Sequence, residues 1–242
     1  MLKDVRFESV YRDKGDNLRK AFLQEVLCRT EAVFCWFPII SLQEILRSSF
    51  GIFELIRNGG RARFLFRTDL TIFDGNSSDG QTGDQSPLEL FSQALDQART
   101  PRDRTRIGLL AWLLVNGRLE IKFAVSTGKT QQEVFSGLPP SLAGIATDEK
   151  GFTVGYELSD AEDAETGTLQ ADCIWSWGDP ARRIYGRLNL FNRIWGAKYP
   201  AVSVIPLPDE LRQKLLTFLP SELPTEEPPV DEGDTGTKPS LY

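Results

Sequence analysis

Two charged residues in the segment RLEIKF have the spacing of a nuclease metal-binding pair. Glu120 and Lys122 are separated by one residue, so both side chains face the same side if the segment is a β-strand. With a further upstream acid, here Asp69 or Asp103, such a pair can hold a divalent ion and polarise water. An exposed strand face explains the pair equally well. The metal-dependent nuclease therefore stands as an alternative and not as the leading interpretation.

Arginines gather in three segments and could bind phosphate if the fold brought them together. The first segment is RARFLFR, the second is RTPRDRTR, and the third is ARRIYGRLNLFNRIWG, which also carries Arg182 and Arg193. The candidate nucleic-acid-binding residues are Arg61, Arg63, Arg67, Arg102, Arg104, Arg106, Arg183 and Arg187. Converging guanidinium groups would contact phosphates with a strong dependence on salt. Dispersed among acidic residues, they would instead form surface ion pairs, each of which contributes little.

The sequence contains no histidine. This absence excludes a Ser-His-Asp or Cys-His nucleophile, a histidine general base and a zinc site that uses histidine. Cys28, Cys35 and Cys173 form no CxxC pair and lie in apolar segments, so we expect buried, reduced thiols. The segment STGKT resembles the end of a phosphate-binding loop but has Phe123 where the earlier glycine belongs. We expect no metal and no cofactor.

Hydrophobic periodicity predicts alternating helices and strands. The expected helices lie near residues 17–29, 42–56, 87–98, 107–117, 181–196 and 208–219, and the expected strands near 31–37, 61–67, 118–125, 142–147, 152–158, 171–177 and 201–206. Ser86 and Pro87 suit the N-cap and the first position of one helix.

One unit occurs twice, at IRNGGRARFLF and at LLVNGRLEIKFAV. Each copy has an apolar helix, an Asn-Gly stop, an arginine and a strand, and Gly59 can take the left-handed conformation that ends a helix. A repeated helix-to-strand unit favours neighbouring, parallel strands. We therefore expect an α/β fold: a single layered α-β-α domain with a mixed sheet.

Composition divides the chain into a domain and a tail. The 242 residues are 40% hydrophobic and 26% charged, which is ordinary for a globular protein. We expect one domain over residues 1–220. Residues 221–242, SELPTEEPPVDEGDTGTKPSLY, hold six acidic residues and one basic residue, with little to bury, so we expect a disordered tail or an interaction peptide. The rest of the chain is close to neutral, without the basic excess typical of an autonomous nucleic-acid binder.

The sequence gives no sign of a membrane segment. No apolar run approaches the ~20 residues of a membrane span, and MLKDVRFESVYRDKGDN is too polar for a signal peptide. We expect a cytoplasmic protein.

Five segments, in this order and spacing, resemble a phospholipase D-like domain. They are YRDKGDNLRKAFLQEVL, IRNGGRARFLF, LLAWLLVNGRLEIKFAV, GIATDEKGFTVG and IWSWGDPARRIYGRLNLFNRIWG. The resemblance covers nearly the whole domain and is to the kind found beside helicases in bacterial DNA-processing and defence loci.

The resemblance implies that the catalytic residues of the family are missing. Active members carry a His-x-Lys pair and a downstream asparagine; the histidine forms a phosphohistidine, and the other two bind phosphate oxygens. Aligned on GIATD (144–148), this sequence has Pro140 at the histidine position, Leu142 at the lysine position, and Ala161 near the asparagine position. In active members two such sets, often from two chains, form one site, so a homodimer is compatible with the resemblance.

The resemblance therefore implies an inactive domain. We expect an accessory subunit of a DNA-processing or anti-phage assembly, with a helicase, another ATPase or another defence subunit as its protein partner and with nucleic acid as a further ligand. Two alternatives stay open: the metal-dependent nuclease that uses Glu120 and Lys122, and a pure protein-interaction module.

Overall fold

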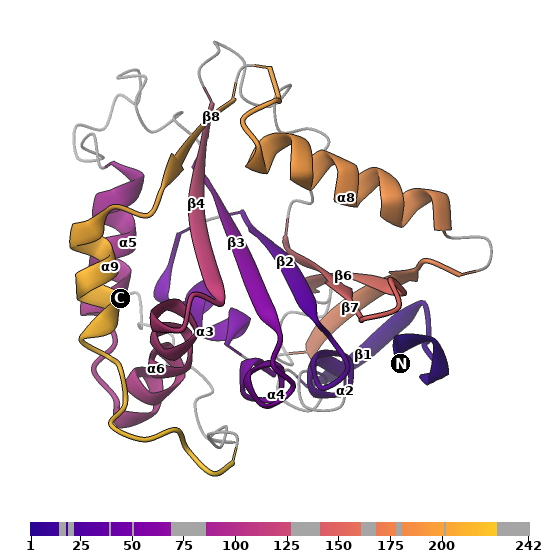
Figure 1. Cartoon of the computed structure of the whole chain (residues 1–242), viewed down its shortest axis with the longest axis horizontal. Coiled ribbons are helices and arrows are strands. Elements are labelled where there is room, and N and C mark those ends of the chain that lie inside the picture. Colours follow the sequence, from indigo (N-terminus) through magenta and orange to yellow (C-terminus); the bar gives the residue numbers. More distant parts are fainter. Residues whose placement is uncertain are drawn as a thin grey trace, which may run out of the picture.

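The strands of the described residues form one mixed sheet in the order β1-β7-β6-β5-β2-β3-β4-β8 (Figure 1). The computed structural model describes residues 1–14, 18, 22–38, 40–49, 51–68, 86–126, 141–160, 168–177, 181–200 and 202–226. The strands are β1 (Val10–Lys14), β2 (Ala32–Phe37), β3 (Arg61–Thr68), β4 (Leu119–Ser126), β5 (Leu142–Thr147), β6 (Thr153–Asp160), β7 (Thr168–Trp175) and β8 (Val202–Pro206). β2, β3 and β4 are parallel to one another, and the other neighbours pair antiparallel.

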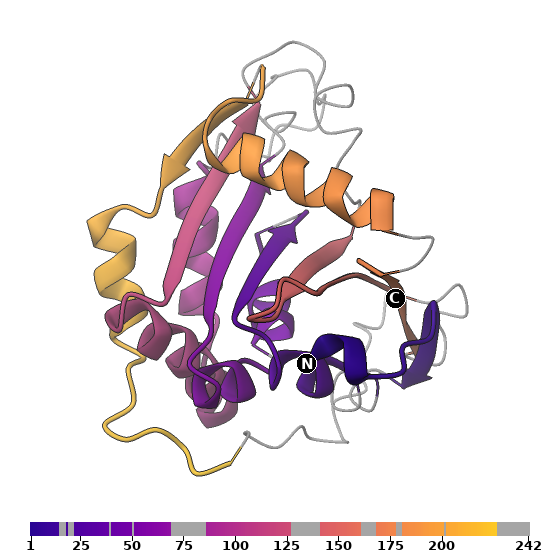
Figure 2. The ribbon, with the colours of Figure 1, turned by 45° about the vertical axis from the view of Figure 1, so that its right-hand side comes forward.

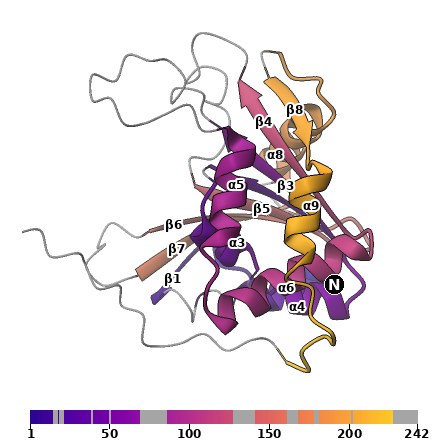
Figure 3. The ribbon, with the colours of Figure 1, turned by 90° about the vertical axis from the view of Figure 1, so that its left-hand side faces the viewer.

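Helices cover both faces of this sheet, which confirms the expected α-β-α layering. A 3₁₀ turn, η1 (Leu2–Asp4), precedes α2 (Gln24–Leu27), α3 (Leu42–Ser48), α4 (Ile52–Arg57), α5 (Pro87–Asp96), α6 (Pro101–Val115), α8 (Ala181–Trp195) and α9 (Asp209–Leu216). Figures 1 and 3 show α3, α5, α6 and α9 on one side of the sheet, and Figure 2 shows α8 crossing the other side.

The repeated helix-to-strand unit produces the parallel pair β3 and β4, as predicted. Gly59 and Gly117 end the two helices with φ of 77° and 65°, a region that glycine enters without steric cost. Arg118 joins the two copies: its Nε donates to Gly60 O at 2.8 Å and its Nη2 to Leu55 O at 3.1 Å. This arginine thereby satisfies backbone carbonyls at the end of α4.

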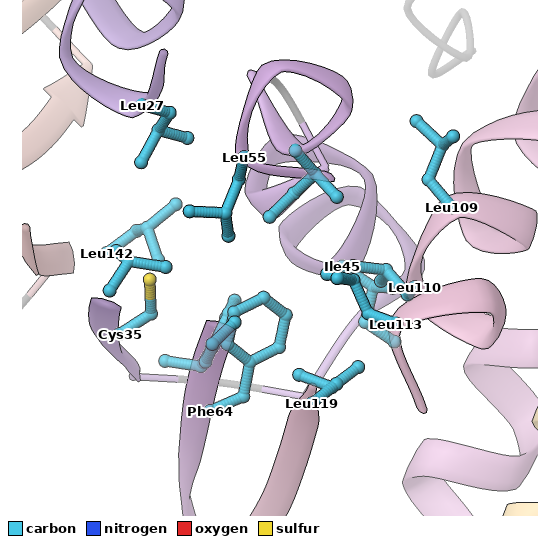
Figure 4. Packing of buried hydrophobic residues seen from close by; sticks show 14 of the residues in the cluster. Leu27, Cys35, Ile45, Leu55, Phe64, Leu109, Leu110, Leu113, Leu119 and Leu142 are labelled. Carbon is cyan, nitrogen blue, oxygen red and sulfur yellow. The ribbon is translucent and has the colours of Figure 1, made fainter. Parts of the chain in front are cut away.

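The larger hydrophobic core lies between the sheet and the helices of the α6 side. Phe66 stacks on Phe37 with ring centroids 4.3 Å apart and meets Phe91 of α5 edge to face at 5.3 Å. Figure 4 shows another part of this core, where Cys35 and Phe64 point from the sheet toward the leucines of the helices. Alternate strand residues supply the sheet side of this core, as the period of a strand requires.

The smaller core lies between α8 and the opposite face of the sheet. Ile184, Phe191 and Ile194 of α8 are buried against Trp36 and Leu65. Phe191 meets the Trp36 ring edge to face at 4.8 Å. Since these contacts use one stripe of α8, the opposite stripe of the helix faces outward.

Two helix predictions were wrong in their bounds. The helix expected over residues 42–56 is divided into α3 and α4, because Gly51 has φ of 74° and a Cβ there would lie 2.8 Å from Leu27 Cδ1. The helix expected from 107 begins at Pro101 instead. Thr100 is its N-cap and accepts a hydrogen bond from the Asp103 N–H at 3.1 Å. The segment RTPRDRTR is therefore largely helical rather than a connection.

Other elements agree with the sequence prediction or extend it. Ser86 caps α5 through a capping box with Glu89, as expected from its position before Pro87. β1 was not predicted, and it pairs with β7 at one edge of the sheet. Leu223, just beyond the expected domain end at residue 220, packs against the larger core. Residues 227–242 and the helix start at 19–21 lie outside the described residues.

The cysteines agree with the sequence prediction in part. All three cysteines are free; Cys35 and Cys173 are buried, whereas Cys28 is half-buried. None of the helices in the described part of the chain combines the length and hydropathy that a membrane crossing requires.

Candidate nucleic-acid interface

The arginines of β3 lie on the same face of the sheet as α8. Arg61 forms an ion pair with Glu31 at 3.3 Å, and Arg63 Nε donates to Glu120 Oε1 at 2.9 Å. The Arg63 guanidinium also lies over the Trp195 ring, 5.5 Å from its centroid. Arg67 is on the same face, four residues further along β3. These cations are held by neighbouring side chains and are only partly available to a ligand.

A cavity of about 200 Å³ opens between these arginines and the starts of the parallel strands. Its lining includes Phe34, Arg61, Arg63, Arg118 and Glu120. Burial lowers the pKa of Arg118, whose guanidinium is already bound to backbone carbonyls. The charges in this cavity serve mainly to join strand ends and helix ends.

The arginines of α6 lie on the opposite side of the sheet. Arg106 is 1% exposed, and its Nη1 is 3.5 Å from Ser49 Oγ, inside the larger-core layer. Arg104 lies over the Phe218 ring at 4.8 Å. Arg102 is half-buried in the first turn of the same helix. These three arginines therefore do not form a common surface with those of β3 and α8.

Arg183 and Arg187 are brought together by one turn of α8. They line a groove of about 440 Å³, whose opposite wall includes Val10 of β1 and Asp172 and Ile174 of β7. Arg187 Nη2 forms an ion pair with Glu157 at 3.4 Å. Both arginines therefore lie on the side of α8 that is next to β1 and β7.

The outward stripe of α8 is basic, and α8 itself contains no acidic residue. Arg182, Tyr185, Gly186, Asn189 and Arg193 are exposed along it. No aspartate or glutamate occurs from residue 180 to residue 208, a segment that holds four arginines and one lysine. The arginines of α8 were predicted as candidates, whereas Tyr185 and Gly186 were not; the long segment without acids was the signal that could have found them.

Glu120 and Lys122, the pair of the nuclease alternative, are both bound to other groups of the chain. Glu120 and Lys122 do share one face of β4, but Glu120 pairs with Arg63, and Lys122 Nζ donates to Trp195 O at 3.1 Å. Asp103 is in the first turn of α6, on the other side of the sheet, and Asp69 lies outside the described residues. Across the described ranges, no three Asp, Glu or Cys side chains gather as metal ligands.

The position that aligns with the family lysine is part of the larger core. Leu142 begins β5, is 5% exposed, and points with Cys35 into the packed layer of Figure 4. A charged side chain there would be desolvated without a partner. Pro140 and Ala161, and the STGKT segment beyond Ser126, lie outside the described residues.

The GIATD stretch has a structural role that explains its form. Asp148 accepts hydrogen bonds from three backbone N–H groups, those of Leu2 at 2.8 Å, Lys150 at 2.9 Å and Phe152 at 3.0 Å. Gly144 packs directly against the Tyr156 ring. A side chain at position 144 would clash, since its Cβ would overlap Tyr156 Cζ. Both residues therefore shape the β5-β6 hairpin.

Comparison with known proteins finds distant structural similarity alone. No family model matches this sequence, and no curated protein matches it. Similar solved structures include TrmBL2, an archaeal chromatin protein with a novel mode of DNA binding, at a TM-score of 0.36 and 11% identity. They also include yeast tyrosyl-DNA phosphodiesterase, a phospholipase D superfamily member, at 0.37 and 9%.

These two matches cover 81% and 80% of this chain, but the chain spans only 55% and 41% of the two matched proteins. Similarity of this size establishes neither a family nor an activity. The α/β architecture with a large mixed sheet rests on the strand pairing itself.

Proposed function

We propose that this chain is a catalytically inactive phospholipase D-like domain that binds nucleic acid and a protein partner. It would act as an accessory subunit of a DNA-processing or anti-phage assembly, beside a helicase or another ATPase. In this role the domain holds phosphodiesters without cleaving them.

The observation that carries the proposal is the absence of histidine from all 242 residues. The family reaction needs a histidine nucleophile that forms a phosphohistidine, so this chain cannot perform that reaction with its own residues. The burial of Leu142 in the larger core supports the same conclusion, because no cation at that position could reach a phosphate. Asp148 and Gly144, which lie in the aligned segment, shape the β5-β6 hairpin.

Nucleic-acid binding is supported by the charges on the α8 side of the sheet. Arg182, Arg183 and Arg193 are exposed there, in a segment without any acid. Exposed guanidinium groups attract a phosphate backbone and release its counterions. A local excess of positive charge on α8 can bind phosphates even though the net charge of the whole domain is close to zero.

The experiment for the accessory role is affinity purification of the tagged protein from its native host. The eluate is divided, one half is treated with nuclease, and bound proteins are identified by mass spectrometry. A helicase, methylase or nuclease that stays bound after nuclease treatment supports the proposal. Recovery of this chain alone contradicts the accessory role.

A pure protein-interaction module is distinguished by a second measurement on the purified protein. If partners are recovered but the protein binds no DNA even at low salt, the nucleic-acid part of the proposal is wrong. The partner contact then carries the whole function.

A further inference from the structure

We infer that the outward stripe of α8 is a contact surface for single-stranded nucleic acid. This inference rests on the proposed function and names the ligand form and the surface. The α8 surface consists of Arg182, Tyr185, Gly186, Asn189 and Arg193, which share one stripe of a 15-residue helix. Figure 2 shows α8 crossing the sheet, with one side toward the strands and the other away from them.

The cations of the α8 surface are available to a ligand. Arg61, Arg63 and Arg187 form ion pairs with carboxylates, whereas within the described residues neither Arg182 nor Arg193 forms one. Arg193 lies over the Tyr199 ring at 5.4 Å, a contact that leaves its charge in place. The two arginines are about 16 Å apart along the helix at 1.5 Å per residue. They can therefore contact separate phosphates of one strand.

Tyr185 adds an exposed aromatic ring to the cations of the α8 surface. Its side chain is 52% exposed, and it lies one turn from Arg182 on a surface that is otherwise polar. An exposed aromatic ring beside a guanidinium group is a platform on which an unpaired base can stack. Bases in a duplex have their faces covered by neighbouring bases, so Tyr185 favours a single strand.

Gly186 lets a ligand approach the helix backbone. A glycine in the middle of an exposed helix costs about 1 kcal/mol relative to alanine. Among the described residues, no atom beyond the adjoining residues and the local helix backbone lies within 4 Å of a Cβ at this position, so packing there does not require glycine. The open space over Gly186 could hold a sugar-phosphate backbone between Tyr185 and Arg193. The Asn189 side-chain amide would then be a hydrogen-bond donor beside it.

An acidic peptide would share the attraction to arginine but would not use the stacking surface of Tyr185. The combination of ring, open backbone and amide therefore favours nucleic acid over a protein ligand. A polyglutamate peptide serves as the probe for the other case.

The test measures binding of a fluorescent, mixed-sequence single-stranded DNA oligonucleotide by anisotropy, with the matching duplex in parallel. The first variant is Gly186→Glu, which adds a carboxylate to the open space while improving helix propensity. We expect it to lose most of the single-strand affinity without unfolding, as circular dichroism will show. Tyr185→Ala is expected to weaken binding about 5- to 100-fold, and Tyr185→Phe to restore it.

A charge-matched pair of double variants separates this surface from general electrostatics. Arg182→Gln with Arg193→Gln should lower the slope of log affinity against log salt by about 1.4, at about 0.7 for each single-strand phosphate contact. Arg99→Gln with Arg212→Gln removes the same charge from exposed positions on the α5 and α9 side, and should leave the slope unchanged.

Each contrary outcome has a distinct meaning. If the unaltered protein binds DNA but the α8 variants bind equally well, the inference is wrong and the proposed function stands. Equal binding of duplex and single strand, with no loss in Tyr185→Ala, overturns the single-strand preference. Polyglutamate binding as tight as oligonucleotide binding overturns the choice of ligand. No nucleic-acid binding at low salt overturns both the inference and the nucleic-acid part of the proposed function.

Discussion

The carboxylate of Asp148 accepts a hydrogen bond from the backbone N–H of Leu2, 146 residues earlier, at 2.8 Å. The same buried side chain holds the N–H groups of Lys150 and Phe152. Asp148→Ala leaves three backbone donors without their acceptor, one in a buried and two in part-buried hydrogen bonds, so we expect it to lower the free energy of unfolding by about 2 to 3 kcal/mol. Denaturant unfolding measures this loss. Asp4→Ala, at an exposed acid near the same turn, is the control, and an equal loss in both would contradict the special role of Asp148.

Much of the fold could be predicted because its signals are local. The repeated Asn-Gly and arginine unit predicted that β3 and β4 are neighbours, and Ser86 with Pro87 predicted the start of α5. The break at Gly51 could not be predicted in the same way, because the close approach of Leu27 that excludes a Cβ there comes from another helix. β1 was missed because VYRDK is polar and contains no apolar run; its partner β7 lies more than 150 residues away.

The candidate interface was predicted in its residue types but not in its geometry. The sequence could not show that the α6 arginines lie across the sheet from those of β3 and α8. Thr100 and Pro101 did carry a helix-start signal that would have placed Arg102 and Arg104 on a helix. Exposure of Tyr185 depends on which stripe of α8 packs on the sheet, and only tertiary structure decides that.

Two glycines should respond to alanine in opposite directions. Gly186→Ala should raise the free energy of unfolding by about 0.5 to 1 kcal/mol, since the position is helical, exposed and open. Gly144→Ala should lower it by about 1 to 3 kcal/mol, since the new Cβ would force the Tyr156 ring to move. Thermal or denaturant unfolding of both variants checks the pair. A destabilised Gly186→Ala would show that the outward stripe of α8 is packed after all.

Alkaline pH should destabilise the fold through its buried thiols. Burial raises the pKa of Cys35 from 9.0 to about 12, while the thiol of the unfolded chain still ionises near 9. Between pH 9 and pH 12, the Cys35 thiol therefore stays protonated in the folded state but ionises in the unfolded chain. This contribution to stability is complete below pH 9 and is lost as pH rises toward 12, at up to about 1.4 kcal/mol per pH unit.

Burial also raises the pKa of Tyr156 and of Cys173, which act in the same direction. Urea unfolding between pH 8 and pH 11 measures the slope. Cys35→Ala should make it shallower, whereas Cys28→Ala, at a half-buried thiol, should leave most of it. An unchanged slope in Cys35→Ala would contradict this assignment.

Divalent metals should not turn the protein into a nuclease. Glu120 is paired with Arg63 and has no described acid beside it that could complete a metal site. We expect purified protein with Mg²⁺ or Mn²⁺ to cleave plasmid DNA no faster than its Glu120→Ala variant does. Cleavage that depends on metal and disappears in Glu120→Ala would revive the nuclease.

Binding without hydrolysis is tested most directly by one measurement on the purified protein. A single-stranded DNA oligonucleotide labelled at its 5′ end is bound, separated with the protein, and then sized on a denaturing gel. The sequence and structure predict retained oligonucleotide of full length at every time point, with binding that weakens as salt rises. Shortened products that form in proportion to protein, or no retained oligonucleotide even at low salt, would contradict an inactive nucleic-acid-binding domain.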